Sequence, residues 1–508
     1  MNLLYLLAFC FARLIAAETN TETGPCGSPS SGPTDNAAQT LYGSSAYLWT
    51  SSIKWNCVYN IKDYPTGTDD ERFIAAQTQA VKNGGGVIYF PAGLYTFANN
   101  LSLSSNIVIR GDVTTDKAKV GFLPGNLNPK TIFNCPSKKH QGIWNFDKDG
   151  TNLGVVNILL NQCAIMFWPS LVTTSYSPIL SNYWFFATDV NGMGSNKLVI
   201  SNLIKDVSYG TPLLGNLSND WPWTFSTALA VYSDKNALVA NNLLAASTQE
   251  ENVTITIAGL TETVPYPYDN RYGIDVNSIL LGGVASSYCK GPTSKCKDSS
   301  AFGGLYPYCA PFNFRTGLVI RDNYVAQNGR IGISWSGGND ETQCIIPGSG
   351  TLVYNNHVEV KANTTCYSID GKNAPRGSDT NENRGFDLSG HCSNVTGNTG
   401  HIHRQLIAHT PYETVDGEGI LHQSENGNWG YGDVIINNDL SGGSSGYIAN
   451  WDLLWSNETT LIGNTVNPDQ FIGVVNLNAD IVGPGWHCSN NNPPAVFKFK
   501  SGDQPCPT

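Results

Sequence analysis

The sequence predicts an all-β solenoid, in which short strands stack coil upon coil behind a single N-terminal helix. Three observations lead to this prediction. The 508-residue chain has 52 glycines, 41% hydrophobic residues and only 14% charged residues, a composition typical of a folded, turn-rich β protein. A helical pattern near the N-terminus is followed by two strand-like runs. A short apolar pattern that ends in asparagine then recurs along the chain, as expected of a repeating coil.

Residues 1–17 have the features of a secretory signal peptide. An apolar stretch runs from Leu3 to Ala12, and the small residues Ala16 and Ala17 precede a plausible cleavage point. The stretch is shorter than the roughly 20 apolar residues that a membrane-spanning helix needs. We therefore expect a secreted, extracellular protein without a membrane anchor.

The cysteines and glycosylation sequons agree with secretion. Loss of Cys10 with the signal leaves an even number of the 13 cysteines, without CxxC or zinc-type spacing. This pattern favours disulfides formed in an oxidising compartment, with Cys289, Cys296 and Cys309 placed for a local link. The chain also has six N-x-S/T sequons, at Asn100, Asn216, Asn252, Asn363, Asn394 and Asn457.

We expect residues 18–60 to form an N-terminal leader and cap, and residues 61–508 to form the solenoid domain. Asp69 or Asp70 is placed to cap a helix in which Phe73, Ile74, Ala76 and Val81 recur at helical spacing. Three glycines at 84–86 end this helix. The runs VIYF at 87–90 and LYTF at 94–97 then predict two strands separated by a Pro-Ala-Gly turn.

The recurring pattern consists of two apolar residues, two further residues and an asparagine. Several of the spacings are about 40 residues or twice that, which suggests a marked position that returns every second coil of about 20 residues. Asparagine suits such a corner, because it tolerates left-handed backbone and its amide can hydrogen-bond to the next coil. The pattern ends at Asn202, Asn242, Asn323, Asn356, Asn398, Asn438 and Asn464.

The stretch TDDERFIAAQTQAVKNGGGVIYFPAGLYTFANNLSLSSNIVIRG, from Thr68 to Gly111, resembles the opening of pectate-lyase-like proteins. The resemblance implies a single-stranded right-handed parallel β-helix with a short capping helix. It also implies a secreted carbohydrate-active protein, since members include glycosidases and lyases. The NTD, GDD, GHG and RIK motifs of polygalacturonases and the WxDH motif of lyases are missing, so the chain does not resemble a standard pectin enzyme.

The candidate catalytic residues lie in TVDGEGIL, at positions 414–421. If this run is a strand, Asp416 and Glu418 lie on one face about 6.5–7 Å apart. Two carboxyl groups at such a separation suit glycoside hydrolysis, more readily with inversion than with retention. The alternative is a solvent-exposed Asp-Gly turn.

Other polar residues cluster around this strand. Five of the eight histidines lie between His391 and His422, and upstream Asp387 adds a third candidate catalytic carboxylate. Residues one coil apart stack about 4.8 Å from each other, so successive coils can assemble these groups into one groove. The candidate substrate-binding residues are Arg384, His401, His403, Arg404, His409 and His422.

The pair His401 and His403, with a nearby carboxylate, also offers ligands for zinc. Buried, hydrogen-bonded histidines are the commoner arrangement, so we expect no metal and no other cofactor. A calcium site built from carboxylates and asparagine carbonyls remains as an alternative.

Together these features predict a secreted glycoside hydrolase that acts on a polysaccharide and works as a monomer. The net charge of -11 and the lack of a basic run disfavour nucleic acid and favour a neutral or weakly charged substrate. One alternative is a polysaccharide lyase that eliminates at a uronate with Arg384 or Arg404 as the base. The other is a solenoid that binds glycans without catalysis.

Overall fold

The computed structural model describes residues 26, 31–112, 127–136, 141–145, 150–167, 194–207, 227–233, 235–245, 250–257, 260–267, 272–277, 317–327, 331–338, 344, 346–360, 383–402, 405–406, 414–415, 417–423, 430–442, 448–451, 456–457, 459–468, 470–476, 485–499 and 501–506.

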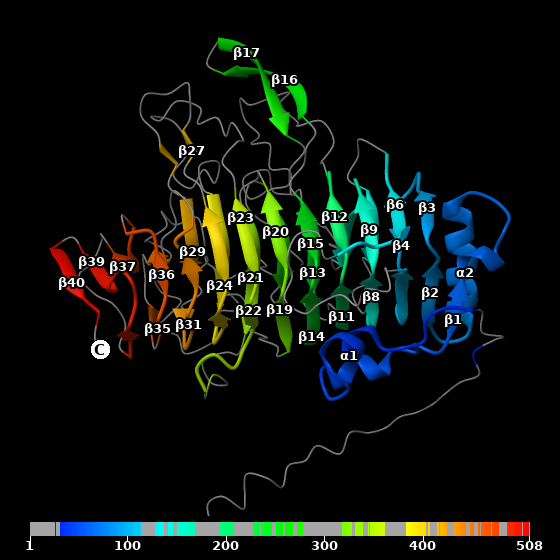
Figure 1. The fold of residues 1–508 in the computed structure, drawn as a ribbon, viewed down its shortest axis with the longest axis horizontal. Helices are drawn as coiled ribbons and strands as arrows, with labels where there is room; N and C mark the ends of the chain where they lie inside the picture. The colour runs from blue at the N-terminus through cyan, green and yellow to red at the C-terminus, as the bar shows by residue number, and fades with distance from the viewer. Residues whose placement is uncertain are drawn as a thin grey trace, which may run out of the picture.

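Three long sheets of parallel strands form the body of the protein, and the strands of each sheet follow one another in chain order (Figure 1). Sheet A contains β1 (Val58–Asn60), β2 (Gly86–Phe90), β5 (Ile107–Gly111), β8 (Leu153–Val156), β11 (Ser195–Ile200), β14 (Lys235–Ala240), β19 (Leu318–Arg321), β22 (Leu352–Tyr354), β25 (Asn394–Thr396), β31 (Val434–Ile436), β35 (Thr460–Ile462) and β38 (His487–Ser489). Sheet B contains β3 (Gly93–Thr96), β6 (Thr131–Asn134), β9 (Ile158–Asn161), β12 (Leu203–Lys205), β15 (Leu243–Ala245), β20 (Tyr324–Gln327), β23 (His357–Val360), β26 (Thr399–Ile402), β32 (Asp439–Leu440) and β36 (Thr465–Val466). Sheet C contains β4 (Leu101–Ser102), β7 (Gly142–Asn145), β10 (Ala164–Phe167), β13 (Thr227–Tyr232), β18 (Tyr272–Asn277), β21 (Ile331–Gly338), β24 (Asn383–His391), β29 (Gly417–Gln423), β33 (Ile448–Trp451), β37 (Ile472–Asn476), β39 (Val496–Phe499) and β40 (Gly502–Pro505).

From β2 to β37, each coil contributes one strand to each sheet, in the order A, B, C, whereas β1 precedes this series in sheet A and β38 is followed directly by β39 of sheet C. Every strand pairs in parallel with its equivalents in the coils before and after, except that β40 turns back antiparallel to β39 at the C-terminal end. Side chains from all three sheets meet in one continuous apolar interior, which includes Ile88, Phe133, Ile165, Trp335 and Phe386. The predicted single-stranded right-handed parallel β-helix is confirmed.

The helix α2 (Asp69–Lys82) closes the N-terminal end of this interior (Figure 1). Its N-cap is Thr68, which forms a capping box with Glu71, so the prediction of an aspartate cap was wrong. Asp70 instead accepts hydrogen bonds from the backbone amides of Ala98 and Asn99 and joins the helix to the first coil.

The apolar face of α2 is narrower than its sequence pattern suggests. Phe73 and Ala76 are buried against the first coil, as expected. Ile74 and Val81, which belong to the same helical pattern, are 59% and 47% exposed. The helix caps an end and does not cross a sheet, and a narrow buried stripe is sufficient for that contact.

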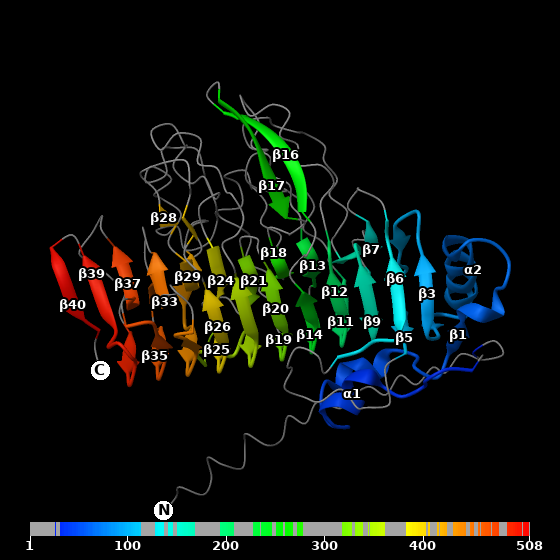
Figure 2. The same cartoon turned by 45° about the horizontal axis from the view of Figure 1, so that its top comes forward.

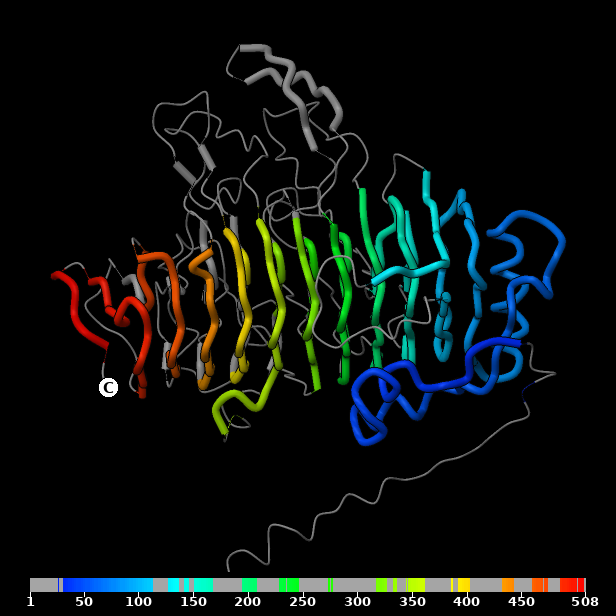
Figure 3. Tube along the Cα trace, in the orientation of Figure 1, coloured from blue at the N-terminus to red at the C-terminus, as the bar shows by residue number. Residues whose placement is uncertain are grey.

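The segment before the first coil covers the outer face of sheet A (Figure 3, blue). It contains α1 (Ala37–Tyr42) and the 3₁₀ helix η1 (Leu48–Ser52). The 3₁₀ helix η2 (Ile61–Asp63) follows β1, and its Ile61 belongs to the solenoid interior. Ala38 and Trp55 pack on Val87 and Val108, which point away from the solenoid interior. β1 lies within residues 18–60, so this region supplies the first strand of sheet A as well as a cap.

This covering segment explains why the strands of sheet A are fully buried in the first coils and only half buried in the later ones. β2 and β5 are buried at every position, and β14 is buried over its last four residues. In each three-residue strand of sheet A from β22 to β35, only the central residue is buried. Burial at successive positions therefore marks the covered half of the sheet, and burial at alternate positions marks the open half.

The seven recurring asparagines form one ladder at the corner between sheets A and B. The amide of Asn398, for example, donates to Val353 O and to Asn438 Oδ1 in the next coil. The ladder continues to Asn491. The predicted coil-to-coil hydrogen bonding is thus confirmed.

Two details of the repeat prediction were wrong. The asparagine returns at every coil, with 26 to 81 residues between neighbours, because coils differ in the length of their loops. The left-handed residue is the one before the asparagine, such as Ser201 or Asn437, with φ of 58° and 54°. This conformation turns the chain sharply from sheet A into sheet B.

Short accessory strands lie outside the three sheets. The hairpin of β16 (Glu250–Ile257) and β17 (Leu260–Pro267) projects from the body (Figure 2). The others are β27 (Gln405–Leu406) with β28 (Thr414–Val415), and β30 (Gly430–Tyr431) with β34 (Ser456–Asn457).

Disulfides support the expected use of cysteine. The described residues contain the pairs Cys26–Cys57, Cys135–Cys163, Cys344–Cys392 and Cys488–Cys506. Cys289, Cys296 and Cys309 lie outside the described residues. Within the described part of the chain, no helix has the length and apolarity needed to cross a membrane.

Candidate functional site

Four of the predicted site residues lie on two neighbouring strands of sheet C. In β24 and β29, Arg384 pairs with Glu418, Asp387 with Leu421, and Leu388 with His422. One coil therefore separates Asp387 and Arg384 from Glu418 and His422. Asp387 pairs with Leu421 and not with Glu418, and residues three apart in a strand face opposite sides of the sheet. Only the backbone positions of these four residues are described.

The other predicted residues are distributed differently. Asp416, His403, Arg404 and His409 lie outside the described residues. His401 lies on β26 in sheet B, whereas Glu418 lies on β29 in sheet C. The structure therefore places His401 and Glu418 on different sheets of the solenoid.

His401 instead belongs to a polar cluster on the outer face of sheet B. In β23 the residues His357 and Glu359 alternate with buried Val358 and Val360. In β26 Thr399 and His401 alternate with the buried positions in the same way. Register places His357 beside Thr399 and Glu359 beside His401.

Three of these side chains converge on one point. Nε2 of His357 lies 3.5 Å from Oε1 of Glu359, and Nδ1 of His401 lies 3.7 Å from the same oxygen. All three ligand atoms lie within 4.8 Å of one another. Two imidazoles thus approach a single carboxylate oxygen from two adjacent coils.

Neighbouring groups fix the orientation of His357. The ring of Tyr324 stacks on it at 4.8 Å, with an interplanar angle of 21°. Nδ1 of His357 lies 2.7 Å from the hydroxyl of Thr399. The ring nitrogen that faces Glu359 is therefore Nε2.

The cluster is only partly exposed, and burial shapes its electrostatics. Burial, followed by the proximity of His401, lowers the pKa of His357, although Glu359 opposes this shift. Burial and a hydrogen bond to Glu359 raise the pKa of Tyr324. At neutral pH, His357 therefore carries a neutral imidazole and Tyr324 a protonated hydroxyl.

The sequence contains a signal for this cluster that we did not use. Counted from the ladder asparagines, His357 follows Asn356 by one residue, as Thr399 follows Asn398. Glu359 and His401 each stand two residues further on. Once the asparagine is known to mark every coil, this alignment predicts that Glu359 and His401 are neighbours.

Comparisons with known proteins find only distant similarity to solved structures. No family model matches the chain, and no curated protein matches it. Among solved structures, the mannuronan C-5 epimerase AlgE4 A-module of Azotobacter vinelandii is 12% identical, with a TM-score of 0.33, over 84% of this chain and 96% of its own. The surface adhesin PfbA of Streptococcus pneumoniae is 11% identical, with a TM-score of 0.35, over 88% and 94%. DFA-IIIase of Arthrobacter chlorophenolicus A6 is 11% identical, with a TM-score of 0.31, over 84% and 86%. The strand topology itself establishes that the chain has a right-handed parallel β-helix fold.

Proposed function

We propose that the protein is a secreted glycoside hydrolase that acts on a polysaccharide where β24 and β29 adjoin in sheet C. The observation that carries the proposal is the register of β24 and β29, which aligns Arg384 with Glu418 and sets Asp387 three residues further along. Charged residues at these positions stand out in a chain with only 14% charged residues.

The chemistry would use two carboxyl groups. One carboxylic acid protonates the oxygen of the leaving sugar, while a second carboxylate removes a proton from the attacking water. Asp416 and Glu418 are our assignment for this pair, with Asp387 as a third carboxylate. If Asp416 continues the strand of Glu418, their separation of about 6.5–7 Å would leave room for water and favour inversion.

The remaining residues would bind and orient the sugar. Arg384 and Arg404 can donate paired hydrogen bonds to hydroxyl or carboxylate oxygens. His403, His409 and His422 would complete the groove. The four disulfides of the described residues support extracellular work, because they persist in an oxidising compartment.

The test is hydrolysis of a panel of polysaccharides, followed by the release of reducing ends and by ultraviolet absorbance. We expect reducing ends without an unsaturated product, and a loss of activity of at least about 100-fold in Glu418→Gln. Asp503→Asn, which alters an exposed carboxylate in β40, is the matched control and should retain activity. Full activity in Glu418→Gln would rule out the assigned pair.

A polysaccharide lyase is the second candidate, and one observation favours it. Arg384 lies in β24, one coil before Glu418 of β29, and an arginine at this position is the type of base that the elimination requires. In that case ultraviolet absorbance rises with the reducing ends, and Arg384→Lys abolishes both signals. If neither signal rises with any substrate, the remaining alternative is a solenoid that binds glycans without catalysis.

A further inference from the structure

We propose that His357, Glu359 and His401 form a binding site for a divalent transition metal of the zinc type on the outer face of sheet B. The ligand atoms are Nε2 of His357, Oε1 of Glu359 and Nδ1 of His401. The inference is independent of the proposed hydrolase activity, because these side chains lie on β23 and β26 and not on sheet C.

The spacing of the three atoms fits a bound ion better than hydrogen bonds. The two nitrogen–oxygen distances are 3.5 Å and 3.7 Å, longer than the usual hydrogen-bond range of about 2.7–3.2 Å. A tetrahedral ion with bonds of about 2.0–2.2 Å separates its ligands by about 3.3–3.6 Å. Small side-chain rotations therefore suffice to close the site around an ion.

The donor set identifies the class of metal. Two imidazoles and one carboxylate suit zinc and its neighbours in the first transition row. Calcium and magnesium prefer a shell of oxygens, so this site differs from the calcium alternative considered from the sequence.

The surroundings hold two of the ligands in place. The hydroxyl of Thr399, 2.7 Å from Nδ1 of His357, is the type of outer contact that fixes the tautomer of a metal-binding histidine. Gly442 lies so close to the Nε2 edge of His401 that a β-carbon there would overlap the ring. The opposite edge, with Nδ1, is left to face Glu359.

The site is accessible, and it joins two coils. The side chains of His357, Glu359 and His401 are 24%, 22% and 46% exposed, so an ion can enter from solvent and keep a water molecule as its fourth ligand. Because His401 belongs to the coil after His357 and Glu359, a bound ion would link β23 to β26. Metal binding should therefore stabilise the folded protein.

The experiment titrates the purified full-length protein, after treatment with a chelator, with Co²⁺ and with Zn²⁺. We expect one equivalent of Co²⁺ to give the visible absorption bands of a tetrahedral site, and Zn²⁺ to displace it and raise Tm. His401→Ala and Glu359→Gln should each weaken binding by at least about 10-fold, and Thr399→Val should weaken it by a smaller factor.

The matched control is His487→Ala, which removes an exposed histidine from β38 in sheet A and should leave the titration unchanged. Circular dichroism shows whether each variant is folded, and His401 is the safest site because it is the most exposed ligand. The proposal is overturned if the wild-type protein binds neither ion, or if folded His401→Ala and Glu359→Gln both bind Co²⁺ as the wild type does.

Discussion

Individual side chains at the corner between sheets A and B carry much of the specificity of this fold. Each internal ladder asparagine uses its amide group to donate to a carbonyl and to the next asparagine, and its oxygen accepts from the preceding coil. Buried backbone groups at a sharp turn would otherwise have no partner. The ladder therefore satisfies the polar groups of every corner with one residue type.

Replacement of one internal ladder residue should be costly. Asn398→Ala would remove the amide donor to Val353 O and Asn438 Oδ1 and the oxygen that accepts from both amides of Asn356. The backbone amide of residue 398 would still donate to Asn438 Oδ1. We expect a loss of about 3 kcal/mol in the free energy of unfolding, measured by denaturant titration. Asn491→Ala, at the partly buried end of the ladder, should cost clearly less. Equal losses in the two variants would contradict the argument from burial.

Asp433 is a second informative residue, at the corner between sheets C and A. It is fully buried, and its Oδ1 accepts a hydrogen bond of 2.7 Å from the amide of Ser393. Burial raises the pKa of this carboxyl well above its ordinary value, although the Ser393 hydrogen bonds oppose the shift. The folded protein thus holds this proton more tightly than the unfolded chain.

This difference predicts a pH-dependent effect of Asp433→Asn. The stabilising effect of proton binding is complete below the unfolded pKa and is lost as pH rises through the folded pKa. We expect the variant to match wild type near pH 4 and to gain stability toward neutral pH, by about 1.4 kcal/mol for each pH unit between the two pKa values. Thermal unfolding at several pH values measures this gain. A difference that does not vary with pH would refute it.

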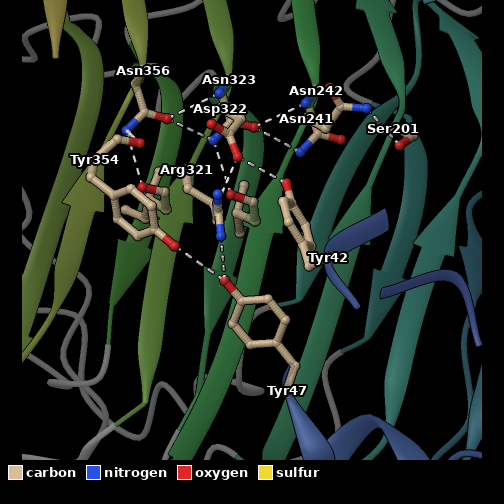
Figure 4. Close-up of polar contacts among 12 residues, drawn as sticks. Tyr42, Tyr47, Ser201, Asn241, Asn242, Arg321, Asp322, Asn323, Tyr354 and Asn356 are labelled. Carbon is tan, nitrogen blue, oxygen red and sulfur yellow. Dashed lines mark hydrogen bonds and ion pairs between the residues drawn. The ribbon is translucent and has the colours of Figure 1, made fainter. Parts of the chain in front are cut away.

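Among the elements, the N-terminal segment is attached to sheet A through an arginine side chain as well as through apolar contacts. Arg321 at the end of β19 lies 4.1 Å from the ring centre of Tyr42 and 4.5 Å from that of Tyr354 (Figure 4). It also donates to Asp322 Oδ2 at 2.6 Å and to the hydroxyl of Tyr47 at 3.3 Å. One guanidinium thereby joins α1 and the start of η1 to the outer face of sheet A.

We expect Arg321→Gln to loosen this segment. The change removes both ring contacts and the cationic partner of Asp322, whose side chain is only 1% exposed and would keep the hydrogen bond from the Tyr42 hydroxyl. A cost of about 3 kcal/mol follows from leaving that buried carboxylate without its countercharge, together with faster proteolysis near Tyr42. Arg72→Gln breaks a surface ion pair with Asp69 and should cost less than about 1 kcal/mol. Unchanged proteolysis in Arg321→Gln would mean that the apolar contacts of Trp55 and Ala38 suffice.

The sequence predicted the repeating asparagine corner better than it predicted which residues and segments are neighbours in the folded protein. The asparagine corner was visible because one residue type meets a strict local requirement. The stacking of Glu359 on His401 was missed because coil length varies, so distance along the chain did not give position in the solenoid. The cover over sheet A was missed for another reason: continuous apolar runs such as 87–90 show that both faces are buried but not by what.

At the scale of the whole molecule, net charge limits which substrates can approach. The chain carries a net charge of -11, and a field of this sign repels polyanions over roughly a Debye length. A long solenoid face adds to this effect, because an extended polysaccharide would contact many coils at once.

This reasoning predicts that salt affects kcat/KM differently for neutral and acidic polysaccharides. If the protein hydrolyses a neutral polysaccharide, kcat/KM should change by less than about twofold between low and physiological ionic strength, because no long-range force acts on the substrate. For a polyuronate, kcat/KM should start low and rise several-fold as salt screens the repulsion. Activity assays across a salt series, with one neutral and one acidic polysaccharide of matched length, measure both effects. A fall in kcat/KM with salt on the acidic chain would instead reveal a local cationic groove that overrides the net charge, and Arg384 and Arg404 would be the first residues to replace.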